Sequence, residues 1–172
     1  MKNKKRVEAF YMGELPTLEG YYIDDILAYK KMQFENKHHF IQWLFPIPTV
    51  SFYNMLAPTL SKNEAQELGK REEFRAKMQE SFRFVCKCYG LEIVEESNNV
   101  CVKPSPDFTG YWLTPNNHNH LRITRMLTCL TNVGLHDYAI ALMKCLEQLC
   151  NERPGCVTGK SLKFWRDAVA DI

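Results

Sequence analysis

Residues 38 to 48 read HHFIQWLFPIP, in which two histidines precede a run of large apolar residues that ends in two prolines. Pro46 biases the residue before it away from helical dihedrals, so a helix running through this stretch is predicted to end at Phe45. On such a helix His38 and Gln42 lie one turn apart, where they either satisfy each other inside the fold or open onto a ligand. One apolar stripe at helical spacing contains Phe34, His38, Ile41 and Phe45.

Composition predicts a folded protein with one sizeable core. The chain has 172 residues, of which 45% are apolar and 24% charged, values typical of globular domains. Its net charge of +2 supplies no large positive field, so dedicated nucleic-acid binding is not expected. The basic residues between Lys2 and Arg6 predict a flexible tail over residues 1–7, followed by a domain over residues 8–172.

Membrane and redox signals point to the cell interior. The most apolar stretch, residues 40–56, is interrupted by Gln42, Pro46 and Pro48, so it cannot form the ~20-residue apolar helix that spans a bilayer. No signal-peptide pattern is visible at the start. The seven cysteines are an odd number, which favours free thiols in a reducing compartment over a disulfide framework. An intracellular protein is expected.

Helical patterns dominate the rest of the chain. Ser61 and Glu64 have capping-box spacing, and the helix that they start is predicted to end at Gly90. Turn residues 97–99 lie between two short β-type runs, which predicts a small hairpin. The fold class is therefore mainly α: a compact multi-helix domain with packed proline-rich loops and one hairpin. Further helices are expected over residues 24–29, capped by Asp24, and over 120–133, 137–151 and 161–170.

Two proline-containing connections carry aromatic residues. Residues 46–60 are expected to form a loop packed on the domain surface, because Phe52, Tyr53, Met55 and Leu56 are apolar. Residues 104–117 carry Phe108, Tyr111, Trp112 and Leu113 as expected core anchors. Cys145 lies on the apolar face of the helix over residues 137–151, so it is expected to be a small core residue and not a reactive thiol.

Known catalytic, metal and nucleotide motifs are not found. Cys86 and Cys88 have one residue between them, where zinc modules have two to four. The string GCVTGKS at 155–161 puts three residues, not four, between the glycines of a phosphate-binding loop. No glycine elbow or oxyanion-hole pattern accompanies a cysteine. The sequence thus predicts a non-enzymatic protein with no cofactor and no metal.

The string HNHLRITR at 118–125 is the most suggestive polar stretch. It starts a helix whose first turns carry Arg122 and Arg125 three residues apart. Such a helix start can hold an anion through free amides and guanidinium groups. Alternatively, the two arginines pair with internal carboxylates such as Asp24, Asp25 or Glu35 and tie helices together. Both interpretations stay open on the sequence alone.

Several strings together resemble the conserved region of the opioid growth factor receptor family. They are YYIDDI at 21–26, FENKHHFIQWLFP at 34–46, CYGLEI at 88–93 and HNHLRITRMLTCLTNVGL at 118–135, within a resemblance that covers about residues 8 to 170. Leu27 and Lys31 stand where the family pattern has aromatic residues. The carboxy-terminal extension of some family members is not seen, so the chain is expected to be the conserved module alone or a short relative.

The resemblance implies a helical intracellular domain, in the nucleus or the perinuclear cytoplasm, that binds methionine-enkephalin and restrains cell growth. The leading hypothesis is therefore a binding module for an enkephalin-type peptide or a protein partner. The alternative is an interaction module with an arginine-lined site for an anionic ligand or nucleic acid. Nothing in the sequence sets the oligomeric state.

Trp43 and Trp112 would suit a peptide cleft, although core packing is the more usual role. The candidate binding residues that match the family motifs are His38, Gln42, Trp43, Asn117, His118, Arg122 and Arg125.

Overall fold

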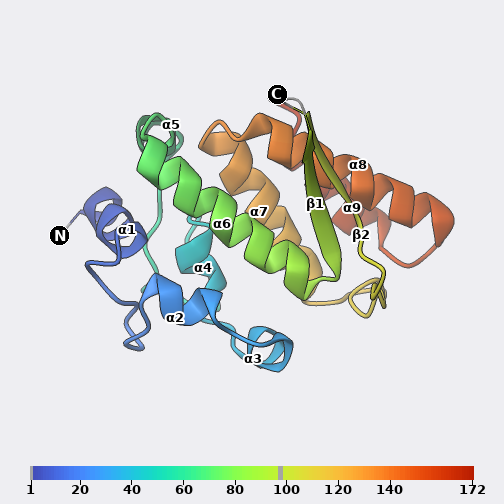
Figure 1. The fold of residues 1–172 in the computed structure, drawn as a ribbon, viewed down its shortest axis with the longest axis horizontal. Helices are drawn as coiled ribbons and strands as arrows, with labels where there is room; N and C mark the ends of the chain where they lie inside the picture. The colour runs from blue at the N-terminus through green and yellow to red at the C-terminus, as the bar shows by residue number, and fades with distance from the viewer. Residues whose placement is uncertain (1, 97–98) are drawn as a thin grey trace.

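The computed structural model describes residues 2–96 and 99–172. Its regular structure is mostly helical with one antiparallel hairpin, which confirms the mainly α prediction (Figure 1). None of the helices in these ranges is long and apolar enough to cross a membrane. The elements are α1 (Asn3–Tyr11), α2 (Ile23–Leu27), α3 (Lys31–Asn36), α4 (Ile41–Leu44), α5 (Lys62–Gly69), α6 (Glu72–Cys88), β1 (Leu91–Glu96), β2 (Asn99–Pro104), α7 (Asn119–Asn132), α8 (His136–Glu152) and α9 (Gly159–Ala168).

The long helix α6 crosses the molecule and organises the core (Figure 1). Its predicted apolar stripe is buried along its whole length, from Phe74 to Val85 and on to Tyr89. Gly90 adopts φ +74°, the left-handed conformation that ends a helix cheaply only for glycine, and β1 begins at the next residue. The sequence correctly predicted both the stripe and its end.

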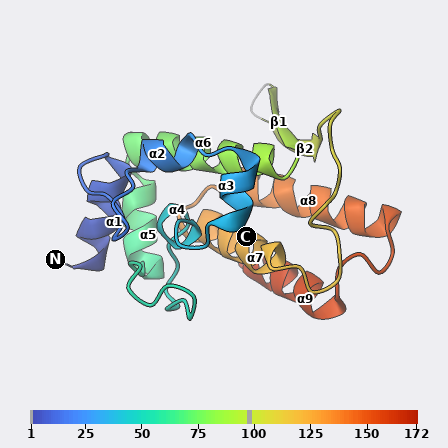
Figure 2. The same ribbon diagram turned by 90° about the horizontal axis from the view of Figure 1, so that it is seen from below.

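The hairpin lies between α6 and α8, with β1 against α6 and β2 against α8 (Figures 1 and 2). Its register pairs Ile93 with Val102 and Val94 with Cys101. The hairpin prediction is thus confirmed for the strands, whereas the predicted tight turn at Ser97 and Asn98 lies outside the described residues.

The helices of the last third agree with their predicted ranges to within two residues, and their apolar faces meet in one core. Gly134 has φ +78° at the end of α7, as the sequence indicated. Cys145 is buried on α8, which agrees with its predicted core role. Trp165 of α9 is fully buried and its Nε1 donates to the carbonyl of His120 at 3.1 Å, which ties α9 to α7.

The capped helix at Ser61 is shorter than predicted. Ser61 accepts a hydrogen bond from the Glu64 amide at 3.3 Å, and the Glu64 carboxylate accepts from the Ser61 amide at 3.0 Å, as in a capping box. The chain then breaks between α5 and α6. Gly69 explains the close packing at the break, because a Cβ there would lie 2.0 Å from the carbonyl oxygen of Val133.

Asn3 to Val7 are not part of a flexible tail, contrary to the prediction for residues 1–7, because they belong to α1. The helix buries Val7, Phe10 and Tyr11 on one side. Among its basic residues, Lys4 pairs with Glu67 of α5. The basic residues that were predicted to form a solvated tail therefore lie on the outer face of an amphipathic helix.

The predicted helix end at Phe45 is confirmed, because Phe45 caps the C-terminal end of α4, but the helix leading to it is not continuous: the chain leaves the helical conformation at Lys37. This residue is extended, with φ −93° and ψ 136°, and separates α3 from α4. The predicted single stripe is consequently two short faces, and His38 and Gln42 are not one helical turn apart. The preceding helix, α2, also differs: it is capped at Tyr22, whose amide donates to Asp25 at 2.8 Å, and not at Asp24.

The middle of the loop between α4 and α5 presents its apolar side chains to solvent, contrary to the packing predicted for them, although Ile47 and Ala57 at its two ends pack against the core. Phe52 is 94% exposed, and Tyr53, Met55 and Leu56 are each 70% exposed. Figure 2 shows this loop projecting past α5. In contrast, Trp112 and Leu113 in the connection after β2 are buried as predicted, while Phe108 and Tyr111 are partly buried against the same core.

Candidate functional site

Trp43 lies in the core and not in a cleft. Its ring packs 5.2 Å from that of Phe10, and the Arg6 guanidinium lies 5.2 Å from its centroid. Only 1% of the residue is exposed, and Trp112 is likewise fully buried. Trp43, in the string FENKHHFIQWLFP at 34–46 that we call the first motif, therefore acts in packing and in a cation–π contact, and neither indole lines an open site.

Gln42 is buried beside the loop after α4. Its Nε2 donates to the Ser51 hydroxyl at 3.3 Å, while its Oε1 has no hydrogen-bond partner among the described residues. His38 bonds instead to Arg122, so the predicted His38 and Gln42 pair does not form. Gln42 holds the loop to α4.

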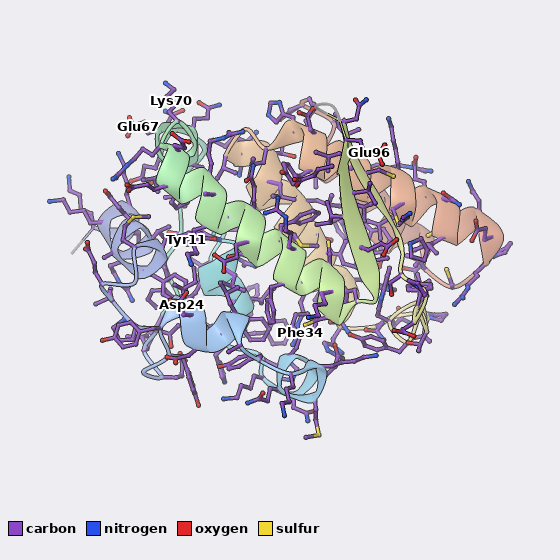
Figure 3. The ribbon with its side chains drawn as sticks, viewed as in Figure 1. Tyr11, Asp24, Phe34, Glu67, Lys70 and Glu96 are labelled. Carbon is purple, nitrogen blue, oxygen red and sulfur yellow. The ribbon has the colours of Figure 1, made fainter. Side chains whose placement is uncertain are left out.

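Arg122 is the centre of the contact between the first motif and the string HNHLRITRMLTCLTNVGL at 118–135, which we call the second motif. Its Nη1 donates to the carbonyl of Phe34 at 3.0 Å and its Nη2 to that of Lys37 at 2.8 Å. The guanidinium also makes cation–π contacts with the neighbouring rings of Phe34 and Phe40, at 5.0 and 5.5 Å from their centroids. Figure 3 shows Phe34 beside the C-terminal end of α6, next to α3. Arg122 thus closes the end of α3, whose last carbonyls have no helical partner.

Arg125 likewise binds a carbonyl at the end of the next helix, α4. Its Nη1 donates to the carbonyl of Phe45, the residue that ends α4, at 3.2 Å. Burial lowers the pKa of this guanidinium from its ordinary value. Within the described ranges it forms no ion pair. The two arginines therefore bind main-chain carbonyls at the ends of α3 and α4 and tie these ends to α7, which is not an open anion site. Among the described residues they make no pair with Asp24 or Asp25, whereas Glu35, the third predicted partner, lies 4.0 Å from Arg122.

Glu35 is the carboxylate nearest to Arg122 and anchors several polar groups. It accepts from the Tyr111 hydroxyl at 2.7 Å and from Asn119 Nδ2 at 3.2 Å, whereas Arg122 Nη1 is 4.0 Å away. Burial, and then the hydrogen bond to Glu35, raise the pKa of Tyr111 well above its ordinary value. Of the internal acids that the sequence offered to the arginines, Glu35 alone comes within reach of Arg122.

His38 and His118 meet at the edge of this cluster, with ring centroids 5.5 Å apart. Arg122 can only donate, so His38 Nδ1, at 3.0 Å from Nη2, accepts and the ring is neutral. His118 Nε2 lies 3.6 Å from Glu35. Burial and the Arg122 charge lower the pKa values of both rings. No group of three metal-ligating side chains exists in residues 2–96 and 99–172.

Asn117 has a local role at the start of α7. Its Oδ1 accepts from the backbone amide of Asn119 at 3.0 Å, and its Nδ2 donates to Thr114 at 3.1 Å. This is the short-range hydrogen bonding that asparagine makes at helix starts. Asn117 therefore fixes the entry into the second motif and does not point into a cavity.

An aromatic cleft, which sequence reasoning missed, lies outside the Arg122 contact. The ring of Tyr21 meets that of Tyr29 edge-on at 6.0 Å, and Lys37 Nζ sits 4.0 and 5.0 Å from the two ring centroids. The Tyr21 hydroxyl accepts from Lys37 Nζ at 2.8 Å. We call this the tyrosine cleft; its volume is about 210 Å³. Its lining consists of Thr17, Glu19, Tyr21, Ile26, Tyr29, Lys37, His39 and Phe40.

The motif residues hold the wall of this cleft in place. Arg122 binds the Lys37 carbonyl and stacks on Phe40, while Phe40 packs edge-on against Tyr29 at 5.6 Å. Lys37 and Phe40 are therefore shared by the motif contact and the cleft. The string YYIDDI was visible in the sequence, but nothing local indicated that Tyr21 would meet Lys37, because the break after α3 creates that contact.

These features define a helical module with a small aromatic cleft, organised by the contact between two sequence motifs. Comparison with known proteins gives the family: the model of the opioid growth factor receptor conserved region matches residues 1–171, and the chain belongs to that family. No solved structure matches the chain.

Two groups of relatives are similar to this chain. Opioid growth factor receptor-like protein 1 of Xenopus tropicalis is 30% identical over 141 residues, covering 78% of this chain and 27% of the relative. The opioid growth factor receptor of Mus musculus is 31% identical over 144 residues, covering 79% of this chain and 22% of the relative. The matched part of the chain thus corresponds to about a quarter of each relative, and both are named as receptors or receptor-like proteins, not as enzymes.

Proposed function

We propose that this chain is a non-enzymatic module that binds a short aromatic peptide in the tyrosine cleft. The observation that carries the proposal is the joint lining of one cleft by Tyr21, Tyr29, Lys37 and Glu19. Aromatic walls accept an aromatic side chain, while an ammonium and a carboxylate offer partners for the two charged ends of a peptide. Family membership supports a binding role, because the relatives carry receptor names.

The size of the cleft limits what enters it. A volume of about 210 Å³ is below the roughly 300 to 1,000 Å³ of pockets that enclose whole ligands. One side chain of the peptide would therefore occupy the cleft while the remainder lies on the surface. Methionine-enkephalin, the ligand that the family resemblance implies, is a pentapeptide with two aromatic side chains and free termini. A flexible peptide loses conformational entropy on binding, so moderate affinity is expected.

The proposal extends to the cellular location of the protein and to the effect of peptide binding on cell growth. All seven thiols are free, which supports a reducing, intracellular setting, in the nucleus or near it as the resemblance implies. Restraint of cell growth would depend on peptide binding and would be lost with it. The alternative of an anion or nucleic-acid site at Arg122 gains no support, because its guanidinium is 6% exposed and bound to main-chain carbonyls.

Isothermal titration calorimetry with methionine-enkephalin tests the proposal, with a scrambled pentapeptide as the ligand control. We expect saturable heat with the native peptide only. Tyr21→Ala should weaken binding about tenfold, since it removes one aromatic wall and the partner of Lys37. The matched control is Tyr22→Ala, because Tyr22 is the neighbouring residue, is similarly exposed (44% against 37%) and does not line the cleft. Equal heats from both peptides, or equal losses from both variants, would contradict the proposal.

A further inference from the structure

The loop between α4 and α5 exposes a contiguous apolar surface that the tyrosine cleft does not use. We call residues 50–56 the apolar loop. Single exposed apolar side chains are ordinary, but a cluster of them marks a surface that contacts something else. Phe52 is 94% exposed, so almost none of its surface contacts the rest of the described chain. The exposed apolar members are Val50, Phe52, Tyr53, Met55 and Leu56.

Polar contacts fix this loop with its apolar side chains outward. Asn54 is buried, its Nδ2 donates to the His39 carbonyl at 3.1 Å, and its Oδ1 accepts from the Ala57 amide at 3.1 Å. Ser51 accepts from Gln42 at 3.3 Å and bridges to Asn54. The polar residues thus face the protein while the apolar ones face solvent, the reverse of an ordinary surface loop. A loop conformation that hydrogen bonds hold in this way presents the apolar side chains to a partner.

A basic helix lies beside the apolar loop. Asn3 of α1 donates to the Thr59 hydroxyl at 2.9 Å, and Arg6 Nη2 donates to the Leu56 carbonyl at 3.4 Å. Within the described chain Lys2, Lys5 and Arg6 form no ion pair, and the two lysines are exposed. Two neighbouring acids are already neutralised, since Lys4 pairs with Glu67 and Arg71 with Glu8.

The apolar loop itself carries no charge. No Asp, Glu, Lys or Arg occurs from residue 38 to residue 61. Between the loop and α1 lies a shallow depression of about 480 Å³, lined by Arg6, Leu15, Leu18 and Leu56. Its single cation among leucines suits a phosphate group attached to an apolar chain. Uncharged apolar side chains that project, flanked by unpaired lysines, are the composition of an interfacial membrane contact.

We propose that the apolar loop and the basic face of α1 form a docking surface for anionic phospholipid membranes. Phe52, Met55 and Leu56 enter the boundary between head groups and acyl chains, and Lys2 and Lys5 contact the negative surface. A fluid lipid phase accommodates side chains that project this far, whereas a protein partner would have to supply a groove shaped to Phe52. Charge complementarity with the unpaired lysines selects anionic lipids.

Co-sedimentation of the full chain with vesicles tests this docking surface. One vesicle preparation is phosphatidylcholine alone, and the other contains roughly three parts in ten of phosphatidylserine. We expect binding to the anionic vesicles, and about tenfold weaker binding to the neutral ones or at high salt. The variant Phe52→Ser/Met55→Ser/Leu56→Ser should lose at least about tenfold in membrane partitioning, because it removes the apolar area that enters the interface.

A matched variant separates this effect from a general loss of surface hydrophobicity. Met32→Ser/Leu121→Ser/Phe164→Ser removes the same three residue types from exposed positions on α3, α7 and α9. It should bind as the native chain does, and Lys2→Gln/Lys5→Gln should lose the preference for anionic vesicles.

Three outcomes would overturn the proposal. They are no sedimentation with either vesicle, equal losses in the loop variant and its matched control, and a native chain that self-associates through the loop without binding lipid. The last result, seen by analytical ultracentrifugation, would assign the surface to contact between two copies. Because the loop does not line the tyrosine cleft, peptide binding by the serine variant distinguishes failure here from failure of the proposed peptide function.

Discussion

Two apolar stretches that almost adjoin in the sequence have opposite environments in the fold. Residues 40–45 are buried, whereas the apolar loop at 50–56 exposes its large side chains to solvent. Aromatic content does not distinguish them. The first stretch is held by long-range partners, since Arg125 binds the Phe45 carbonyl and Phe10 packs on Trp43. Burial is thus set by the partners that the fold brings to a residue, and mutations should expose this difference directly.

The largest expected difference separates Trp43 from Phe52. Trp43→Ala should lower the free energy of unfolding by ~3 to 5 kcal/mol, because it leaves a cavity against Phe10 and removes the stacking of Arg6. Phe52→Ala, at a residue 94% exposed, should change it by no more than ~0.5 kcal/mol. Urea denaturation of both variants measures the two values. Similar losses would show that the two regions are not distinct in energy.

The next largest effect is expected at Arg122. Arg122→Ala leaves the carbonyls of Phe34 and Lys37 without their donor, which should cost about 2 to 4 kcal/mol of unfolding free energy. Arg122→Lys should recover only part of the loss, because an ammonium cannot reach both carbonyls while contacting the rings of Phe34 and Phe40. Chemical denaturation of the two variants is the measurement. Full recovery by lysine would indicate that charge alone matters here.

Acidification should produce a smaller loss of stability, which arises from three histidines. Burial lowers the pKa values of His38, His118 and His120 in the folded state. The unfolded chain therefore takes up protons first, so stability falls as the pH drops through the ordinary value of 6.5 and levels off below the folded pKa values. Unfolding free energies from about pH 8 to pH 5 measure the slope. His38→Gln/His118→Gln should flatten it, and an unchanged slope would assign it to other groups.

The sequence predicted the features that depend on neighbouring residues. The Ser61 and Glu64 cap, the stripe on α6 and the glycine that ends it all follow from spacing within one or two helical turns. The break at Lys37 does not, because it depends on Arg122, a residue 85 positions away that binds the Lys37 carbonyl. The exposure of Phe52 was not predicted either, because the apolar composition of residues 46–60 suggested packing and the exposure depends on contacts made elsewhere in the fold.

The site residues show the same division. The sequence identified Arg122 and Arg125 as important but left open whether they bind an anion or tie helices together. Their actual partners are main-chain carbonyls, which side-chain identity does not reveal. The tyrosine cleft was missed because Tyr21 and Lys37 meet only once α3 has ended. Contacts between residues far apart in the sequence therefore determine the structure of both the buried region and the cleft beside it.

NMR distinguishes a peptide-binding cleft, built by the contact between the two motifs, from binding at the apolar loop. Methionine-enkephalin is titrated into ¹⁵N-labelled protein while the amide resonances are followed by NMR. We expect saturable shifts at Tyr21, Tyr29 and Lys37, with the amides of Phe52 to Leu56 unchanged. Shifts centred on the apolar loop, or no shifts at millimolar peptide, would contradict it.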